Sequence, residues 1–397
     1  MKRLLVVAAA TALASSSGMA ASALAAPSQS GITHRNVAVC GAPAAGYAAC
    51  NSLRHETLRD GKPVQPAAST WTQGYGAADL QSAYAIPAQG APTSSSPIVA
   101  IVDAYDDPTA ASDLNTYRST MKLPACGSGC FTKVNQTGGS TPPRANGGWA
   151  QEISLDLDMV SVACPSCRIL LVEASSSSFS NLATAVQYAA SVPGVKAISN
   201  SYGGSDSSNI AAYENAAAAG IAVTASTGDN GYQVQSPASF THVVAVGGTS
   251  LSRASGGRGW SEAAWSGAGS GCSTINATPG WQTNTSCGKK ANADVSSDAD
   301  PNTGVAVYDS TKYQGYVGWL VFGGTSASSP LVGSLYALAN NLSAGSYAGQ
   351  YTWSHTSALN DVTSGSNGTC STAVWCTSGT GWDGPTGLGT PNGTGAF

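Results

Sequence analysis

Short apolar runs alternate with helical patterns along most of this chain, and this alternation constrains the fold more than any other feature. Apolar runs typical of strands lie at residues 98–102, 168–173, 195–199, 221–225 and 243–247. Helical patterns lie at residues 113–121, 149–163, 179–190, 208–219 and 326–340. Strands that are apolar throughout are buried on both faces, as in a parallel sheet covered by helices. The sequence therefore predicts an α/β fold, a mostly parallel sheet with helices on both faces in one large domain.

Two regions lack this pattern. Residues 26 to about 70 show no clear periodicity, and we interpret residues 26–73 as a short N-terminal leader. Residues 250–320 are rich in Gly and Ser with few long apolar runs, which predicts loops with short strands. We therefore expect the main domain to span residues 74–397.

The first 25 residues have the parts of a secretory signal peptide. Lys2 and Arg3 give a positive start, residues 4–13 are apolar, and Ala23-Leu24-Ala25 is a small-x-small cleavage site. The apolar run is shorter than the roughly 20 residues that span a bilayer. We expect a cleaved signal over residues 1–25 and a secreted, extracellular protein; the alternative is an uncleaved N-terminal helix.

The composition excludes some partners. Charged residues make up 10% of the chain, against about 25% in typical soluble domains. The net charge of −4 offers no basic face for nucleic acid or an anionic membrane. We expect a monomer that binds neither, and a chain with few ionisable groups gains little charge in acid.

The chain has ten cysteines, which suits an oxidising compartment. They fall into close sequential pairs, so we predict five local disulfides: Cys40–Cys50, Cys126–Cys130, Cys164–Cys167, Cys272–Cys287 and Cys370–Cys376. The Cys164-Pro165-Ser166-Cys167 segment also resembles a redox or zinc motif, but zinc would need a second ligand pair.

A serine between glycines and an apolar helix marks a candidate nucleophile. Ser326 follows Gly323-Gly324-Thr325 and opens the helical pattern at 326–340. Backbone N–H groups at a helix start can stabilise an oxyanion, and glycine lets a substrate backbone approach closely. The alternative is an ordinary capping role for Thr325 or Ser326. The chain has four histidines, and none lies where a Ser-His-Asp enzyme would place one: His34, His55, His242 and His355.

The helical pattern at 149–163 carries two carboxylates one turn apart. Glu152 and Asp156 fall within an apolar arc, whereas Asp158 falls on the opposite face, where we expect solvent. Burial and mutual repulsion would make Glu152 and Asp156 share one proton, and such a pair can act as a general base in acid. The alternative is a solvated acidic face.

Two further aspartates follow predicted strands. Asp229 comes after the run at 221–225, at the strand end where ligands bind in parallel sheets, although Asp in such a turn is most often a turn former. Asp103 comes after the run at 98–102. It could extend a proton network from the two helix carboxylates, or it could simply cap a helix.

Three motifs in this chain resemble the sedolisins, or serine-carboxyl peptidases, which share the subtilisin fold. Residues 324–330 match Gly-Thr-Ser-x-x-x-Pro, and the helix carries Glu-x-x-x-Asp at Glu152 and Asp156. Residues 227–231 are similar to Ser-Gly-Asp-x-Gly, with Thr227 in place of Ser. The motifs occur in the family's order, and the resemblance covers about residues 74–397.

The resemblance implies a role for each motif residue. Ser326 would be the nucleophile, Glu152 the base and then the acid, and Asp156 its orienting partner. Asp229 would donate to the oxyanion, which requires it to be protonated, so activity should peak in acid. Asp103 is placed similarly to an acidic residue behind the family's Glu-Asp pair.

The resemblance also implies one structural Ca²⁺ near the C-terminus. Residues 381–391 look like the family's calcium signature, and Asp-Gly clusters on glycine-rich loops can offer the oxygens that calcium takes. By themselves such clusters usually mark turns. The implied ligands are two carboxylates and three carbonyls: Asp361, Val362, Gly379, Gly381 and Asp383.

These features predict a secreted acid endopeptidase that hydrolyses proteins or peptides through an acyl-enzyme. One alternative is a subtilisin-type Ser-His-Asp peptidase, and another is an inactive or binding-only homologue. An esterase is a weaker candidate because the Gly-x-Ser-x-Gly elbow is absent at Ser326. The chain departs from the family because only about 50 residues separate Ala26 from the main domain, where relatives carry a large, self-cleaved prodomain.

Overall fold

The computed structural model describes residues 31–65 and 69–397, and the predicted signal peptide lies outside these ranges. Its main sheet has eight strands, of which seven form one path and β16 (Val295–Asp298) pairs with β12. The path runs β13 (Trp260–Ala264), β12 (Val244–Arg253), β10 (Ala222–Ser226), β8 (Val195–Asn200), β5 (Ile98–Ala104), β7 (Arg168–Ala174) and β6 (Phe131–Asn135). Every pairing is parallel except β12 with β13. The predicted α/β fold is therefore confirmed.

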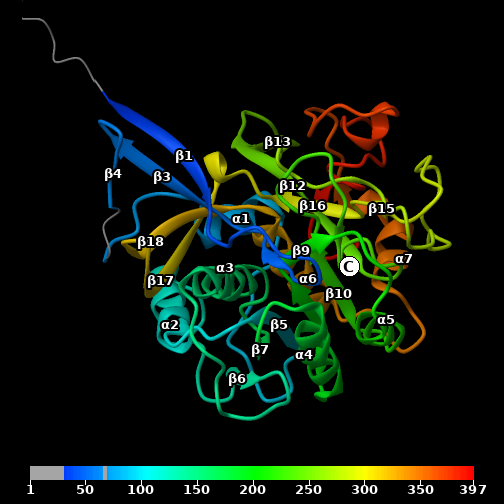
Figure 1. Ribbon diagram of the computed structural model, residues 1–397. Coiled ribbons are helices and arrows are strands. Elements are labelled where there is room, and N and C mark those ends of the chain that lie inside the picture. The colour runs from blue at the N-terminus through cyan, green and yellow to red at the C-terminus, as the bar shows by residue number, and fades with distance from the viewer. Residues whose placement is uncertain (1–30, 66–68) are drawn as a thin grey trace, which may run out of the picture.

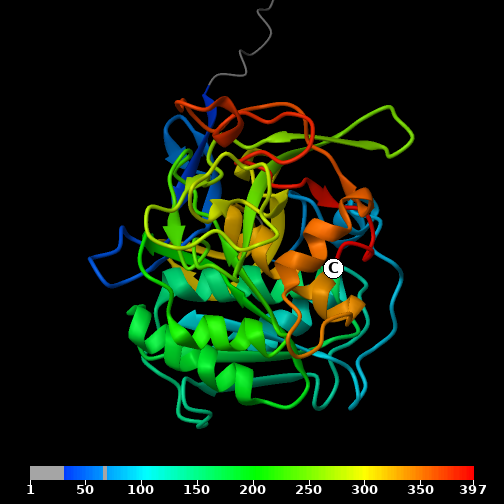
Figure 2. The same ribbon diagram turned by 90° about the vertical axis from the view of Figure 1, so that its right-hand side faces the viewer.

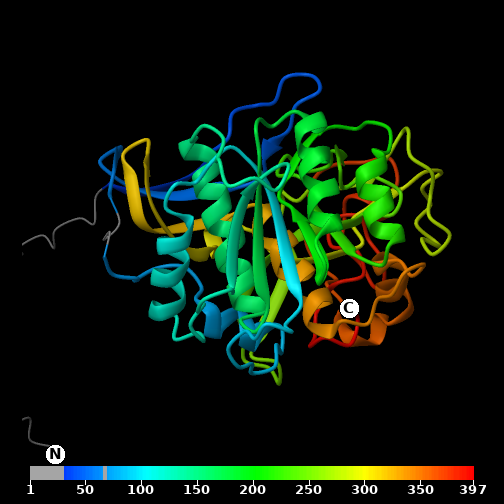
Figure 3. The same cartoon turned by 90° about the horizontal axis from the view of Figure 1, so that it is seen from below.

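Helices cover both faces of this sheet (Figures 1 and 3). The helices α3 (Gly147–Ala163) and α6 (Thr325–Ala339) pack together on one face, with α2 (Ala110–Thr120) beside α3. The other face carries α4 (Phe179–Ser191) and α5 (Ala211–Ala218). All seven residues of β5 are buried, as expected for a central strand. Each predicted helix and strand is present, although β12 continues six residues past its predicted end at 247.

The prediction that one face of α3 meets solvent is wrong. Asp158 is 1% exposed, and its Oδ2 accepts the Tyr308 N–H at 3.0 Å. Tyr308 belongs to β17 (Val305–Tyr313), which packs against α3. Sequence periodicity could not reveal this second cover, because it comes from a strand about 150 residues downstream.

A second, five-stranded sheet joins the N-terminal leader to the chain near residue 320 (Figure 1). Its order is β1 (Ile32–Ala38), β3 (Leu53–Arg59), β18 (Tyr316–Gly323) and β17, and β4 (Lys62–Pro63) pairs with β3. The hairpin of β17 and β18 contains strands of nine and eight residues, so the expectation of short strands at 250–320 is wrong there. Gly and Ser around the hairpin hid its apolar alternation from the sequence.

Short elements complete the structure. The strand β2 (Ala49–Cys50) pairs with β9 (Tyr202–Ser205), which also pairs with β11 (Gln235–Ser236). The remaining elements are α1 (Ala77–Ala83), α7 (Ala348–Ser354), β14 (Gly271–Cys272), β15 (Ala291–Asn292), β19 (Leu359–Asn360), β20 (Thr390–Pro391), and the 3-10 turns Pro301–Thr303, Thr356–Ala358 and Ala373–Trp375. The C-terminal segments gather on one side of the molecule around α7 (Figure 2). All five predicted disulfides are present.

Within residues 31–65 and 69–397, every helix is too short or too polar to cross a membrane.

Candidate active site

Ser326 lies in the first turn of α6, where the chain passes from β18 into the helix. Gly324, with φ of +96°, is the N-cap, so the alternative of an ordinary capping role for Thr325 or Ser326 is wrong. Glycine adopts this backbone region without strain, which lets the chain turn sharply before the serine. Ser326 is fully buried, and its Oγ donates to the Ser201 carbonyl oxygen at 3.1 Å.

Glu152 and Asp156 lie together on α3, which packs directly against α6. Both side chains are fully buried, and their four carboxyl oxygens lack a hydrogen bond of ordinary geometry in the described structure. Burial and the neighbouring Asp156 raise the pKa of Glu152 well above its usual value, while the nearby Ser52 and Ser326 hydroxyls lower it. The structure thus places the Glu152 carboxyl next to Ser326.

Asp156 lies between Glu152 and a third buried carboxyl. Burial, and then Asp103, raise the pKa of Asp156 well above its usual value, whereas the neighbouring Ser201 hydroxyl and Glu152 carboxyl lower it. The neighbouring buried carboxyls of Glu152, Asp156 and Asp103 cannot all be charged in a site without water. They therefore share protons.

A fourth carboxyl extends this row and was missed from the sequence. Glu173 is the penultimate residue of β7 and pairs in register with Asp103 on β5. Burial raises the pKa of Glu173 to about 8, although Lys133 at 3.5 Å lowers it. The available signal was that a carboxylate directly follows the run at 98–102 and another ends the run at 168–173, and parallel strands end at the same edge.

Asp229 approaches Ser326 from the loop after β10. Its Oδ1 accepts the Thr325 N–H at 2.8 Å and the Thr325 hydroxyl at 2.9 Å, while its Oδ2 is buried without a partner. Burial raises its pKa to about 7, against the lowering effect of the bonds from Thr325. A methyl group on Gly324 would lie 2.6 Å from this Oδ2, so the glycine leaves room for the carboxyl.

The four histidines all have partners elsewhere. His34 and His55 stack on each other between β1 and β3, with ring centroids 4.9 Å apart. His242 pairs with Glu214 and stacks on Tyr347, and the His355 ring bonds to the Tyr351 carbonyl at 2.7 Å. The base nearest Ser326 is therefore a carboxyl.

The leader covers this group of side chains. The Ser326 N–H donates to the Asn51 carbonyl oxygen at 2.9 Å, and the Ser52 hydroxyl lies beside Glu152. Asn51 and Ser52 are 6% and 1% exposed. Ser326, Glu152 and Asp156 owe their full burial partly to this segment, which sequence analysis placed outside the site.

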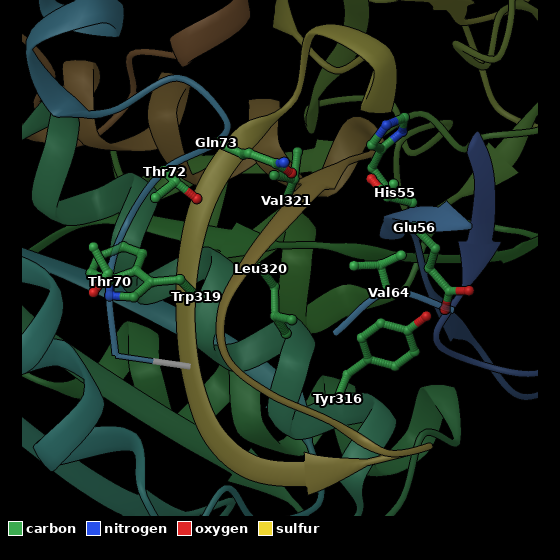
Figure 4. A pocket seen from close by; sticks show the side chains of 11 residues that line it. His55, Glu56, Val64, Thr70, Thr72, Gln73, Tyr316, Trp319, Leu320 and Val321 are labelled. Atoms are coloured by element: carbon green, nitrogen blue, oxygen red, sulfur yellow. The ribbon is translucent and has the colours of Figure 1, made fainter. Parts of the chain in front are cut away.

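Where the leader continues past the site, it forms a small pocket of about 80 Å³ with β18 (Figure 4). Figure 4 shows Glu56 of β3 and Tyr316 of β18 on one side, with the Tyr316 hydroxyl directed toward Glu56. Glu56 is held by Arg54, whose Nη2 lies 2.6 Å from its Oε1. Arg54 belongs to the same strand as Glu56, and the residues that line the pocket differ from the buried carboxyls near Ser326.

The residues expected to bind calcium lie on two C-terminal loops that contact each other. The Gly381 N–H donates to Asp361 Oδ2 at 2.9 Å, and the Gly379 N–H donates to Asp383 Oδ2 at 3.1 Å. Val362 follows Asp361 in the chain, so the five expected ligands lie on these two contacting loops. Its donors are oxygens only, from carboxylates and carbonyls, which suits a hard cation.

A second acidic cluster was missed from the sequence. Asp107, Asp113 and Asp309 are buried, and each offers an oxygen within 4.8 Å of the others, close enough to hold a metal ion. Hydroxyls already occupy several of these oxygens, including Ser310 Oγ at 2.8 Å from Asp113 Oδ1 and Thr311 Oγ1 at 3.0 Å from Asp107 Oδ1.

The mostly parallel sheet, the helices on both of its faces and the buried serine at the start of α6 define a subtilisin-like α/β fold. The family model described as "Subtilase family" matches residues 145–371, more than half of the chain. The chain therefore belongs to the subtilase family, and its relatives support the sedolisin branch of that family.

Kumamolisin of Bacillus sp. (strain MN-32) is 32% identical over 61% of this chain and 49% of its own length. Sedolisin of Pseudomonas sp. (strain 101) is 34% identical over 45% of this chain and 34% of its own length. The chain thus spans about half or less of the length of these curated relatives. A solved structure described as Pseudomonas sedolisin, a serine-carboxyl proteinase complexed with pseudo-iodotyrostatin, matches with 26% identity and a TM-score of 0.66, over 81% of this chain and 96% of that one.

Proposed function

We propose that this chain is a secreted serine-type endopeptidase that hydrolyses protein or peptide substrates in acid through an acyl-enzyme. The observation that carries the proposal is the buried Glu152 carboxyl beside the Ser326 hydroxyl, with the histidine rings engaged elsewhere. The kinship with serine-carboxyl proteinases supports it. Secretion rests on the signal peptide expected at residues 1–25.

Ser326 would attack the substrate carbonyl while its proton passes to Glu152. The buried carboxyls of Glu152, Asp156, Asp103 and Glu173 repel one another's negative charge, so only some of them are ionised. The negative charge that they keep acts as the base. Glu152 then returns the proton to the leaving amine, and the bond between the acyl group and the amine breaks. Water, deprotonated by Glu152, attacks the acyl carbon, the ester bond to Ser326 Oγ breaks, and Glu152 returns the proton to Oγ.

The developing oxyanion would receive two hydrogen bonds, from the Ser326 N–H and from protonated Asp229. A charged Asp229 would repel the oxyanion instead. Asp229 supports the reaction while it is protonated, below its pKa of about 7, and this support is lost as the pH rises through that value.

The test is a pH profile of cleavage of a denatured protein substrate. We expect rates to be highest in acid and to fall by about tenfold for each pH unit above the Asp229 pKa of about 7. Initial rates from about pH 2 to 9, each corrected for enzyme inactivation, measure this. A rate that rises through neutral pH would favour a Ser-His-Asp peptidase, and no cleavage of a folded preparation at any pH would favour a binding-only protein.

Two substitutions of Asp229 test whether its carboxyl acts as a protonated hydrogen-bond donor. Asp229→Ala removes a donor and should lower kcat by about 10²–10³ in acid. Asp229→Asn keeps an N–H donor at every pH, so it should retain more activity than Asp229→Ala and move the alkaline limit upward. Full activity of Asp229→Ala in acid would contradict the assignment.

We also propose that one structural Ca²⁺ is held by the carboxylates of Asp361 and Asp383 and the carbonyls of Val362, Gly379 and Gly381. The all-oxygen donor set on two contacting loops supports it. The ion would join these loops and stabilise the C-terminal side of the fold.

Chelation should therefore lower the melting temperature. Calcium present at 100 times its Kd contributes about 2.7 kcal/mol, so for a chain of this size we expect EDTA to lower Tm by about 3–4 °C near neutral pH. Scanning calorimetry of the Ser326→Ala variant avoids self-digestion. Asp361→Asn should remove the EDTA effect, whereas the matched exposed change Asp60→Asn should keep it. An effect that survives Asp361→Asn but disappears in Asp113→Asn would place the ion in the other acidic cluster.

A further inference from the structure

Ser201 joins two strands beside the candidate nucleophile. It lies between β8, which ends at Asn200, and β9, which begins at Tyr202. The residue is fully buried, and it contacts the start of α6. Its carbonyl accepts the Ser326 hydroxyl, whereas its own hydroxyl takes no part in the steps of acyl transfer described above.

Ser201 and Ser326 exchange two hydrogen bonds. The Ser326 hydroxyl donates to the Ser201 carbonyl oxygen at 3.1 Å, and the Ser201 hydroxyl donates to the Ser326 carbonyl oxygen at 3.4 Å. The second bond is longer than an ordinary bond between a hydroxyl and an oxygen. A hydroxyl held in this way can rotate toward a better acceptor.

The better acceptor beside Ser201 is Asp156. The Ser201 hydroxyl lowers the pKa of Asp156, against the raising effects of burial and of Asp103. Both carboxyl oxygens of Asp156 are buried without a hydrogen bond of ordinary geometry. Because a hydroxyl has one proton to donate, Ser201 can donate to the Ser326 carbonyl or to Asp156, but not to both at once. A charged carboxylate is the stronger of the two acceptors.

The next residue along the chain does not supply this hydrogen bond. Tyr202 also lies near Asp156. Its hydroxyl donates to Asn200 Oδ1 at 2.7 Å and contacts the Tyr213 hydroxyl at 3.0 Å. Since the tyrosine proton is directed at Asn200, the Ser201 hydroxyl remains as the donor beside Asp156.

The titratable groups around Asp156 are mostly acidic. Among the ion pairs of residues 31–65 and 69–397, none includes Asp156. Its charged form therefore depends on hydrogen-bond donors such as the Ser201 hydroxyl. The groups that face Asp156 and its neighbouring carboxyls are Glu152 on the same helix, Asp103 on β5, Glu173 on β7 with Lys133 of β6 and Asp106, Asp229 after β10, and Tyr202 of β9.

We propose that Ser201 is a positioning residue for proton transfer, and that its hydroxyl turns between Asp156 and the Ser326 carbonyl according to the charge on Asp156. This inference rests on the proposed function. When Asp156 is charged, the hydroxyl donates to it and stabilises the negative charge beside Glu152. When Asp156 is protonated, the hydroxyl returns to the start of α6. The bond from the Ser326 hydroxyl to the Ser201 carbonyl is the same in both positions.

Loss of this hydroxyl should move the acid limit of activity. Catalysis needs a negative charge on the carboxyls near Ser326, and that charge is lost as the pH falls through their pKa. Ser201→Ala removes a donor to the charged form, so the charge should be lost at a higher pH. We expect the acid limb of kcat/KM to move upward by about one pH unit, which is the size of a hydrogen bond to a charged group. The alkaline limb set by Asp229 should stay in place.

The experiment measures kcat and KM for a peptide substrate from about pH 2 to 9 in the wild type, Ser201→Ala and Ser201→Thr, with folding checked by calorimetry. Ser201→Thr keeps a hydroxyl and should restore the acid limb to within about 0.3 pH unit of the wild type. The KM of Ser201→Ala should change by less than about threefold, because the backbone carbonyl at 201 remains. Ser201→Val has nearly the shape of Ser201→Thr without the hydroxyl, so these two variants give the same comparison if Ser201→Ala does not fold.

Ser199→Ala is the matched control. Ser199 is also fully buried, two residues earlier at the end of β8, and its hydroxyl contacts the Ser329 hydroxyl at 3.0 Å. It therefore contacts the same helix about one turn beyond Ser326. We expect both limbs of the pH profile to stay where they are in the wild type.

Each result decides between the two claims. An acid limb of folded Ser201→Ala that coincides with the wild type, or an equal shift in Ser199→Ala, overturns the inference and leaves the proposed function intact. A loss of kcat that is uniform over pH, or a limb that Ser201→Thr does not restore, shows a purely structural role for Ser201 and also overturns it. A folded wild type that cleaves no substrate at any pH overturns the proposed function together with the inference.

Discussion

Ser326→Ala is expected to lower kcat on protein substrates by about 10⁶, because loss of the nucleophile removes the acyl-enzyme route. The substitution removes one hydroxyl that donates to the Ser201 carbonyl oxygen, while the backbone N–H at 326 remains. Substrate binding should therefore persist, and KM should change far less than kcat. Initial rates at the acid optimum, with the variant made in a host free of contaminating acid peptidases, measure both constants.

A nearby serine on the same helix serves as the control. Ser328 is also fully buried, but its hydroxyl donates to the Ser297 carbonyl oxygen at 3.1 Å, on the side of β16. Ser328→Ala should cost about 1 kcal/mol of stability and leave kcat close to that of the wild type. If Ser326→Ala kept more than a small fraction of the activity while remaining folded, the nucleophile would be another residue.

Glu152→Gln is expected to lower kcat by about 10⁴, the upper end of what general acid–base catalysis supplies. Glutamine has nearly the same shape and can still contact the Ser52 and Ser326 hydroxyls, but it cannot accept a proton. The volume and packing of the buried site are conserved, so the loss should appear in kcat rather than in folding. Single-turnover rates at several pH values separate chemistry from product release.

Asp158→Asn is the matched control for this change. Asp158 lies on the same helix and is equally buried, with its pKa raised well above the usual value by burial, but it bonds to the Tyr308 N–H of β17. We expect it to keep near wild-type activity with the same pH profile. A comparable loss in Asp158→Asn would mean that Glu152→Gln acts through the stability of α3 and not through proton transfer.

Local patterns account for what the sequence predicted well. Strand 98–102 is apolar at nearly every position because it is buried on both faces, so its type could be read without a partner. Cysteines 3 to 15 residues apart meet because the chain between them is short. The Glu152 and Asp156 pair is also local, since one helical turn separates the two residues.

Predictions about surroundings were less successful. Asp158 was expected in solvent, yet β17 covers it, and the leader was expected to be irregular, yet β3 joins β18. Glu173 was missed because its importance depends on Asp103 of the neighbouring strand β5, with which it pairs. In each case the deciding contact joins residues 70 or more positions apart, which no local periodicity encodes.

The sequence by itself therefore determined the order of helices and strands, the disulfides and the identity of the candidate reactive side chains, because these depend on neighbours along the chain. Only the tertiary structure decided which carboxyls are buried next to one another. It also decided that the leader lies across Ser326, with the Asn51 carbonyl against the start of α6. Burial of a charge and closure of a cleft both depend on segments brought together from distant parts of the chain, and these are what set the pKa values of the site and its access to substrate.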